Sequence, residues 1–171
     1  MQKPAIHVSN AEPDDAPPLP SDRITDTQIP EFSVRYHGTY IDKVLLDGGA
    51  GVNIITQAAC NKYGLKDWEP APFLVRMADQ RRVQPMGLLK GVVIDVAGLT
   101  FSVALVVLSI AEAVDDYNII LGRPWLRQAR VKHNWDSNQL TVRKGRRKVR
   151  IALGACRQRP QAAWQIGRAH V

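Results

Sequence analysis

The sequence of 171 residues contains only two cysteines, Cys60 and Cys156, and neither belongs to a CxxC pair. Two distant thiols form neither a disulfide framework nor a cysteine-based zinc site, which favours a reducing, intracellular setting. The four histidines are scattered without HxH or HxxxH spacing. The sequence therefore predicts no metal site and no cofactor.

Long apolar runs are also absent. The longest one, from Leu99 to Ile110, is interrupted by polar residues. It falls short of the about 20 apolar residues that a membrane-spanning helix needs. The N-terminus, Met1-Gln-Lys-Pro-Ala, has no apolar signal-peptide region. We therefore expect an intracellular, cytoplasmic protein that does not bind membranes.

Acidic residues are missing from the C-terminal end. All 16 Asp and Glu residues precede Arg143, whereas nine of the 23 Lys and Arg residues lie from Arg143 onward. The net charge of +7 is thus a property of this end of the chain. Its basic run contains no aromatic residue, which favours a solvated segment, with nucleic-acid contact as the alternative. We expect residues 143–171 to be a basic, unstructured tail.

The two ends of the chain are expected to lie outside the folded part. Residues 1–30 hold six of the eleven prolines, and their apolar residues follow no period. This composition predicts a disordered, Pro-rich arm. At the other end, residues 165–171 read like the in-frame translation of a common sequencing adapter, and we leave them out of the fold prediction.

Short strands dominate the middle of the chain. The alternation from Phe32 to Tyr36 and the run Thr39–Leu46 predict a hairpin. Thr56 is expected to cap a helix over Gln57–Tyr63 that ends at Gly64. The other expected elements are strands at 52–55, 73–78, 83–89, 91–96, 99–108 and 118–121, a helix from 124 to about 129, and a strand pair over 131–142. This order predicts a compact, mainly antiparallel β domain.

Two apolar strands end in glycine, in Leu45-Leu46-Asp47-Gly48-Gly49-Ala50 and in Ile119-Ile120-Leu121-Gly122-Arg123. One interpretation is a reactive Asp47 at a strand end, supported by the second strand and its turn. The alternative is two ordinary strand-to-turn transitions, since aspartate is a common turn residue. A single aspartate supplies the two carboxylates of acid–base chemistry only if a two-fold dimer brings two copies together.

The sequence resembles the retropepsin-like aspartic proteases, and within them the protease segments of long-terminal-repeat retrotransposon polyproteins. The stretch 44–50 resembles the hydrophobic-hydrophobic-Asp-(Ser/Thr)-Gly-Ala loop of that family. The stretch 117–126, with Gly-Arg-Pro-Trp-Leu, resembles the apolar segment that leads into the family's C-terminal helix. The resemblance covers about residues 32–135. It implies a small, closed, antiparallel β-barrel-like retropepsin fold with one or two short helices over residues 31–142.

The resemblance also implies a function. A homodimer, with Asp47 from each chain, would activate a water molecule and cleave extended peptide segments of a polyprotein as an aspartic-type endopeptidase. An inactive retropepsin-like dimerisation or peptide-binding domain is the alternative. The remaining implied site residues are the active-site loop Gly48, Gly49 and Ala50, the flap residues Ala78, Asp79, Gln80 and Arg81, and the supporting residues Leu121, Gly122 and Arg123.

Three positions depart from the pattern of the family. Gly48 replaces the usual Ser or Thr, whose hydroxyl bonds across the dimer. Gly51 stands where viral members often carry an aspartate that pairs with the arginine matched by Arg123. We therefore expect Arg123 to bind another acceptor, such as a backbone carbonyl. The polar residues 79–82 replace a glycine-rich flap tip.

Three other side chains are expected to have structural roles. Trp125 and Trp135 are more readily explained by core packing than as substrate platforms. Cys60 lies on the expected helix without a paired His or Asn, so we expect a packed thiol rather than a nucleophile.

Overall fold

The computed structural model describes residues 28–109 and 117–154. The expected Pro-rich arm lies almost wholly outside these residues, and the adapter-like end lies entirely outside them. In chain order, the elements are β1 (Glu31–Tyr36), β2 (Thr39–Leu46), β3 (Ile54–Thr56), α1 (Gln57–Tyr63), β4 (Val75–Arg76), β5 (Arg82–Val83), β6 (Gly87–Val96), β7 (Leu99–Leu108), β8 (Ile119–Leu121), α2 (Arg123–Gln128), β9 (Lys132–Asn134), β10 (Gln139–Lys144) and β11 (Arg147–Ala152).

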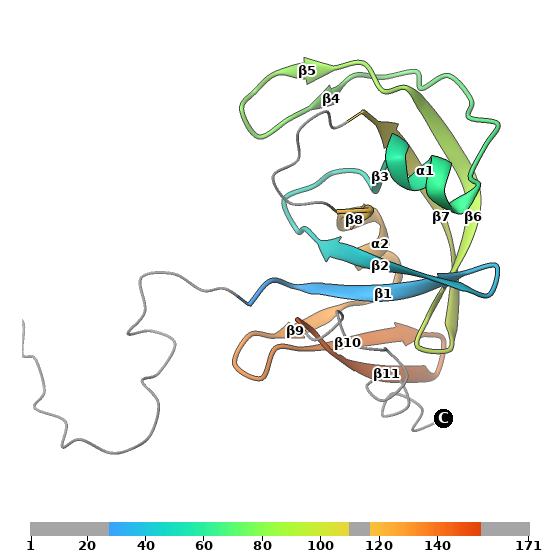
Figure 1. Cartoon of the computed structure of the whole chain (residues 1–171). Coiled ribbons are helices and arrows are strands. Elements are labelled where there is room, and N and C mark those ends of the chain that lie inside the picture. Colours follow the sequence, from blue (N-terminus) through green and yellow to red (C-terminus); the bar gives the residue numbers. More distant parts are fainter. Residues whose placement is uncertain (1–27, 110–116, 155–171) are drawn as a thin grey trace, which may run out of the picture.

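Six strands close a barrel in the order β1-β2-β8-β3-β7-β6 (Figure 1). A three-stranded sheet, β11-β10-β9, and the short hairpin β4-β5 complete the architecture. The expected closed β-barrel with two short helices is confirmed. Two of its strand pairs are parallel, β2 with β8 and β3 with β7, whereas the other pairs are antiparallel.

Local sequence signals fix the boundaries of α1. The Thr56 side chain accepts a hydrogen bond from the Ala59 amide at 3.1 Å, which satisfies one free donor of the first turn. Gly64 ends the helix in the left-handed conformation, with a φ of 75°. Both boundaries are as predicted. No helix among residues 28–109 and 117–154 is long and apolar enough to cross a membrane.

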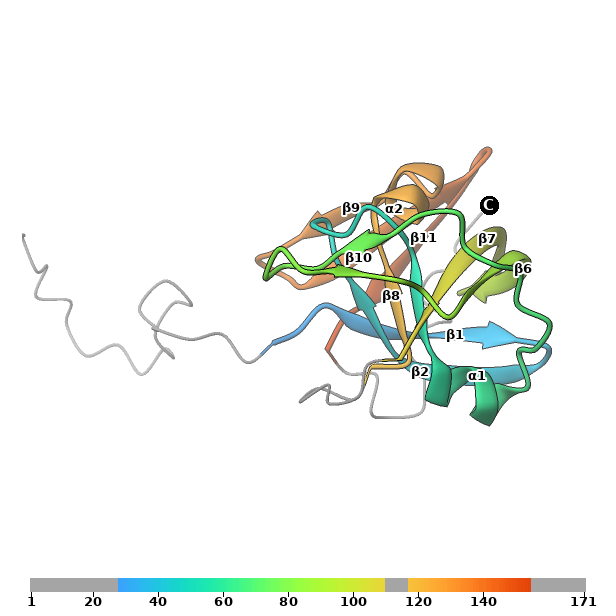
Figure 2. The same cartoon turned by 90° about the horizontal axis from the view of Figure 1, so that it is seen from above.

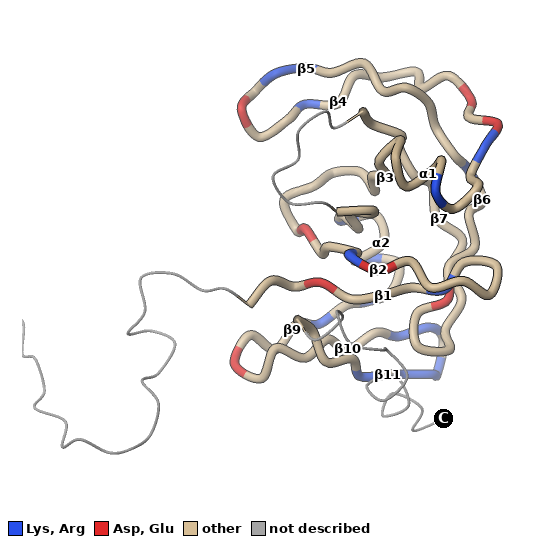
Figure 3. Tube along the Cα trace, viewed as in Figure 1, with Lys and Arg blue, Asp and Glu red and all other residues tan. Residues whose placement is uncertain are grey.

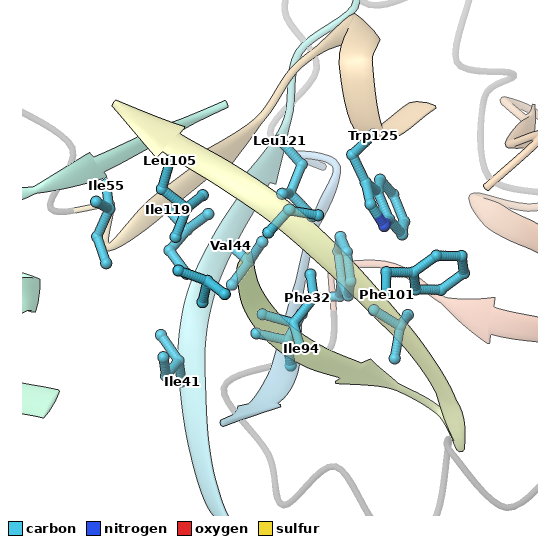
Figure 4. Close-up of a cluster of buried hydrophobic side chains, with 14 of the residues drawn as sticks. Phe32, Ile41, Val44, Ile55, Ile94, Phe101, Leu105, Ile119, Leu121 and Trp125 are labelled. Carbon is cyan, nitrogen blue, oxygen red and sulfur yellow. The ribbon is translucent and has the colours of Figure 1, made fainter. Parts of the chain in front are cut away.

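The main core lies inside the barrel, where Figure 4 shows part of it, and includes buried residues of α2, β10 and β11. Trp125 on α2 is fully buried, with its ring centroid 6.0 Å from that of Phe32 and 5.7 Å from that of Phe101. These contacts attach α2 to strands β1 and β7 of the barrel. The expected core role of Trp125 is confirmed.

Strand β6 is longer than expected. The sequence predicts separate strands at 83–89 and 91–96, but one strand runs from Gly87 to Val96 and pairs with β7 along its length. Its register shifts between Leu89 and Val92, next to Gly91 with a φ of 65°. Glycine adopts this left-handed conformation at little cost, so a bulge here lets the strand continue.

The unstructured tail predicted from residue 143 onward is wrong for its described part. Residues 143 and 144 complete β10, which pairs with β11 through Lys144 and Arg147 at the turn. The reason is an alternation that the basic residues mask: Val149 and Ile151 point into the core, while Lys148 and Arg150 are exposed. The domain boundary therefore lies beyond residue 142.

The expected core position of Trp135 is also wrong. Its side chain is 75% exposed in the turn between β9 and β10. The ring lies beside His133, with 3.9 Å between the centroids. The turn carries Trp135 beyond the last pair of the sheet, Asn134 with Gln139, so no core surface covers it.

Replacing Ile151 by Ala tests whether β11 belongs to the folded domain. Because Ile151 is fully buried, we expect the change to lower the free energy of unfolding by about 2–5 kcal/mol. Arg150→Gln, one residue away on the exposed face, should change it by less than about 0.5 kcal/mol. Urea unfolding followed by circular dichroism measures both. Equal, small effects would contradict a packed C-terminal hairpin.

Candidate active site

The parallel pairing of β2 with β8 sets the position of Asp47. The register aligns Leu46 with Leu121, so both strands end at the same edge of the barrel. Asp47 follows β2 directly, and its amide donates to the Leu121 carbonyl at 3.0 Å. Two glycine-rich strand ends that are far apart in the sequence therefore meet, and the half-buried Asp47 lies between them.

Two main-chain amides of the following loop bond to Asp47, one to its side chain and one to its main-chain carbonyl. The Gly49 amide donates to Asp47 Oδ1 at 2.8 Å, and the Ala50 amide donates to the Asp47 carbonyl at 3.1 Å. A Cβ atom on residue 49 would lie 3.1 Å from Oδ1, closer than most side chains approach. Glycine at 49 therefore lets the backbone pass close to the carboxylate. Gly48, in contrast, has open space around it.

Arg123 forms two hydrogen bonds to main-chain carbonyl groups of the loop that follows Asp47. Its amide donates to the Ala50 carbonyl at 2.9 Å, and its Nη1 donates to the Gly48 carbonyl at 2.9 Å. The prediction of a backbone acceptor for Arg123 is thus confirmed. A Cβ atom on Gly51 would lie 3.2 Å from Arg123 Nη2, so a carboxylate at that position would meet the same guanidinium.

Gly122 has no room for a side chain. A Cβ atom there would overlap the Val52 carbonyl and would lie 2.6 Å from the Ala50 carbonyl. Its backbone is extended, with a φ of −93°, so the requirement for glycine comes from close packing and not from the dihedral angle. Leu121, Gly122 and Arg123 therefore contact the Asp47 loop as the resemblance implies.

Asn53 is a buried polar residue that supports the loop, a role that the sequence did not predict. Its Oδ1 accepts from the Gly122 amide at 3.0 Å, and its Nδ2 donates to the Ala104 carbonyl at 3.2 Å. The side chain thus joins the end of β8 to β7. Its only signal in the sequence is a polar residue inside the apolar run 52–55.

The expected flap residues lie in the turn between β4 and β5. The Arg81 amide donates to Asp79 Oδ1 at 3.0 Å, and Arg81 Nε lies 2.5 Å from Asp79 Oδ2. The backbone hydrogen bond from Arg81, followed by its side-chain hydrogen bond, lowers the pKa of Asp79 below its ordinary value. Gln80 has a positive φ of 70°. A charged, internally bonded turn thus takes the place of a glycine-rich tip, and Ala78 is exposed beside it.

The β4–β5 hairpin and the Asp47 loop face the same side of the molecule, one above the other (Figures 1 and 2). Val75 of β4 belongs to a second apolar cluster, together with Leu88, Ile54 and buried residues of β7. Four half-buried side chains, those of Val52, Met77, Val83 and Ile120, border this cluster. The hairpin is therefore attached to the barrel through apolar contacts next to the loop.

Cys60 is fully buried on α1. Burial raises the pKa of its thiol to about 11, although a contact with Trp68 opposes the change. The thiol therefore stays protonated and poorly nucleophilic at neutral pH. This confirms the expected packed thiol.

The barrel and the aspartate loop define the chain as a member of the retropepsin-like fold class. Residues 32–148 match the family described as "Retroviral aspartyl protease". The chain therefore belongs to the retroviral aspartyl protease family.

No curated protein sequence matches the chain. Solved structures, in contrast, do resemble it. The crystal structure of the retroviral protease-like domain of Ddi1 from Leishmania major superposes with a TM-score of 0.53. The match has 15% sequence identity and covers 69% of this chain and 88% of that one. At this level of identity the likeness shows the fold.

Two alanine substitutions separate the glycines that packing requires from those that it tolerates. Gly122→Ala should lower the free energy of unfolding by about 1–3 kcal/mol, because the new methyl group overlaps two carbonyl oxygens. Gly48→Ala should be neutral or stabilising by up to about 1 kcal/mol, because its surroundings are open and its φ is not left-handed. Chemical denaturation of both variants gives the difference. If the two variants had equal free energies of unfolding, the close packing around Gly122 would be disproved.

Proposed function

We propose that the protein is an aspartic-type endopeptidase that acts as a homodimer, with Asp47 from each copy. The observation that carries the proposal is the environment of this carboxylate. Its Oδ1 is held by the Gly49 amide in a loop whose glycines 48 and 49 are exposed. No group in the described ranges donates a hydrogen bond to Oδ2. That oxygen is therefore available to a water molecule and to a second carboxylate.

The chemistry follows from the pairing of two such loops. Two carboxylates about 3 Å apart do not both ionise, so they share one proton and titrate as a unit. The ionised carboxylate removes a proton from a bound water, which attacks the peptide carbonyl carbon. The protonated carboxyl group donates to the carbonyl oxygen. The Gly49 amide fixes the orientation of each carboxylate, which lowers the cost of assembling the pair.

The substrate that best fits the site is an extended peptide lying under the β4–β5 hairpin. An extended chain pairs with exposed backbone by strand addition, and alternate side chains point to one side. The half-buried Val52, Met77, Val83 and Ile120 would contact apolar side chains of that peptide. The sequence Gly-Arg-Pro-Trp-Leu at 122–126 supports a retrotransposon-type polyprotein as both the parent and the substrate.

A non-catalytic domain that dimerises or binds peptides is the second candidate, and Gly48 is the observation that favours it. The glycine offers no hydroxyl to bond across a dimer. Its carbonyl accepts from Arg123 of the same chain. Each loop is therefore supported internally, and pairing of the two loops relies on other contacts.

Cleavage of a peptide library by the full chain at pH 4 to 6 tests the proposal. We expect Asp47→Asn to lower the rate by about a thousandfold or more, because the amide neither shares the proton nor acts as a base. An aspartic-protease inhibitor that mimics the transition state should block cleavage by the wild-type protein. A folded, dimeric protein that cuts no peptide would support the non-catalytic candidate instead.

Gly48→Ser tests the role of the missing hydroxyl. The open space at Gly48 admits the side chain without strain, so the unfolding free energy of the monomer should change by less than about 0.5 kcal/mol. We expect tighter dimers, measured by sedimentation equilibrium, and faster cleavage at low protein concentration, because the hydroxyl can bond across the dimer. Gly48→Ala is the matched control, since it adds the carbon without the hydroxyl. Equal behaviour of the Ser and Ala variants would exclude a cross-dimer hydrogen bond.

A further inference from the structure

The sheet formed by β9, β10 and β11 has an apolar inner face and a basic outer face. Four apolar side chains of β10 and β11 are buried in the main core: Leu140, Val142, Val149 and Ile151. Side chains alternate between the two faces of a strand, so the residues between these four point outward. By this alternation and the register of the sheet, four basic residues lie on the outer face: Lys132, Arg143, Lys148 and Arg150.

No carboxylate of the described residues neutralises this basic face. Within residues 28–109 and 117–154, none of the four basic side chains forms an ion pair. Arg143 lies directly opposite Lys148 in the β10–β11 pairing, and like charges at paired positions repel. Residues 132–152 hold seven Lys and Arg residues and one acidic residue, and Figure 3 shows this excess along β10 and β11. The outer face therefore favours a negatively charged occupant.

The segment that precedes β1 has the opposite charge. Residues 1–27, which make up most of the Pro-rich arm, contain five acidic and two basic residues, a net charge of −3 with His neutral. The five acidic residues lie between positions 12 and 26, at Glu12, Asp14, Asp15, Asp22 and Asp26. The charge of the arm is thus complementary to that of the outer face.

The arm joins the domain at one end of this sheet. The Glu31 carbonyl, at the start of β1, accepts a hydrogen bond from the Gly154 amide at 3.2 Å. Gly154 follows β11 by two residues, and the Ile29 carbonyl lies 3.7 Å from the position that a Cβ atom on Gly154 would take. The first described residues of the chain therefore lie next to the end of β11.

The lengths of the two segments are compatible. An extended chain advances about 3.4 Å per residue. Arg150 and Lys148 lie two and four residues before the end of β11, which corresponds to about 7 and 14 Å along the strand. Asp26 and Asp22 precede Gln28, the first described residue, by two and six residues, so an extended arm reaches up to about 7 and 20 Å. The arm is therefore long enough to bring these carboxylates to the basic side chains.

Covalent attachment favours the arm over a free polyanion. A single exposed ion pair contributes little to binding, so a separate acidic molecule binds such a face only at high concentration. The arm is held beside the face by a short connection, which gives it an effective concentration of about a millimolar or more. The same argument favours the arm of the same chain over that of a second copy.

We propose that the Pro-rich arm binds across the outer face of the β9–β10–β11 sheet of its own chain. Asp26 and Asp22 contact Arg150 and Lys148, and the acidic residues before them add to the negative charge over the face. This binding is independent of the proposed proteolysis, because none of these residues belongs to the Asp47 loop. It also directs the arm away from the β4–β5 hairpin, which lies on the opposite side of the barrel (Figure 1).

Paramagnetic relaxation, measured by NMR on the full chain, tests the proposal. A nitroxide label on Ser21→Cys, in a chain that also carries Cys156→Ser, leaves the buried Cys60 unlabelled. We expect the label to broaden the amide signals of Lys148 and Arg150 at low salt. Because salt screens exposed ion pairs, about 0.5 M NaCl should remove most of this broadening.

Charge variants separate ion pairing from simple proximity of the arm to the sheet. Asp22→Asn with Asp26→Asn removes two ion pairs and should lower the ratio of bound to free arm about fivefold. Lys148→Gln with Arg150→Gln should have the same effect. Reversal of both sets, with Asp22→Lys and Asp26→Lys beside Lys148→Glu and Arg150→Glu, should restore the broadening, which a merely misfolded sheet would not do.

The matched control removes two positive charges from another exposed surface, with Lys62→Gln and Lys66→Gln. It should keep the broadening of the wild type, because these side chains do not face the arm. Equal loss of broadening in this control and in the sheet variant would overturn the proposal. Broadening that persists at high salt and in every charge variant would show proximity alone and would also contradict it.

Two further results would assign the face to another occupant. If spin-labelled chains broaden the signals of isotope-enriched, unlabelled chains in a mixture, the arm binds a second copy. If a single-stranded oligonucleotide at micromolar concentration removes the broadening, an external polyanion is the preferred occupant. Either result overturns binding within one chain, whereas the absence of both, together with recovery in the charge-reversed variant, supports it.

Discussion

The parallel pairing of β2 with β8 is the constraint on which the candidate site depends. It aligns two strand ends so that Asp47 and Gly122 meet, although the Arg123 and Gly48 that bond across this junction are 75 residues apart in sequence. Antiparallel neighbours would place these ends at opposite edges of the barrel. The absence of a side chain at Gly122, the Asn53 side chain and the Arg123 guanidinium then fix the distance between the two loops. The position of the carboxylate thus depends on backbone register more than on any one side-chain contact.

The same pairing explains why one chain supplies only one of the two carboxylates that the proposed reaction needs. The barrel has one parallel β2–β8 edge that ends in an aspartate, so each copy presents one carboxylate. Gly49 and Ala50 donate their amides to Asp47 within the chain, and Arg123 supports the Gly48 carbonyl. The loop is therefore organised by bonds within one chain, without the second copy of the proposed dimer. Because of this preorganisation, the proposed dimer needs to contribute only the second carboxylate, in the correct position.

Features of the site that depend on local sequence were predictable, and those that depend on distant partners were not. Thr56 and Gly64 mark the ends of α1 because capping involves residues only three or four positions away. Asn53 was missed because its partners, Ala104 and Gly122, lie 51 and 69 residues away. Strand β11 was missed because basic residues fill its outer face and conceal the alternation with Val149 and Ile151.

Strand β11 matters for the stability of the domain, because Val149 and Ile151 are buried in the main core. Its buried side anchors the sheet to the core, and the resulting stability outweighs the repulsion among the basic side chains of its outer side. The three-stranded sheet lies on the opposite side of the barrel from the β4–β5 hairpin (Figure 1). The C-terminal hairpin therefore stabilises the barrel from the side that lies away from the β4–β5 hairpin.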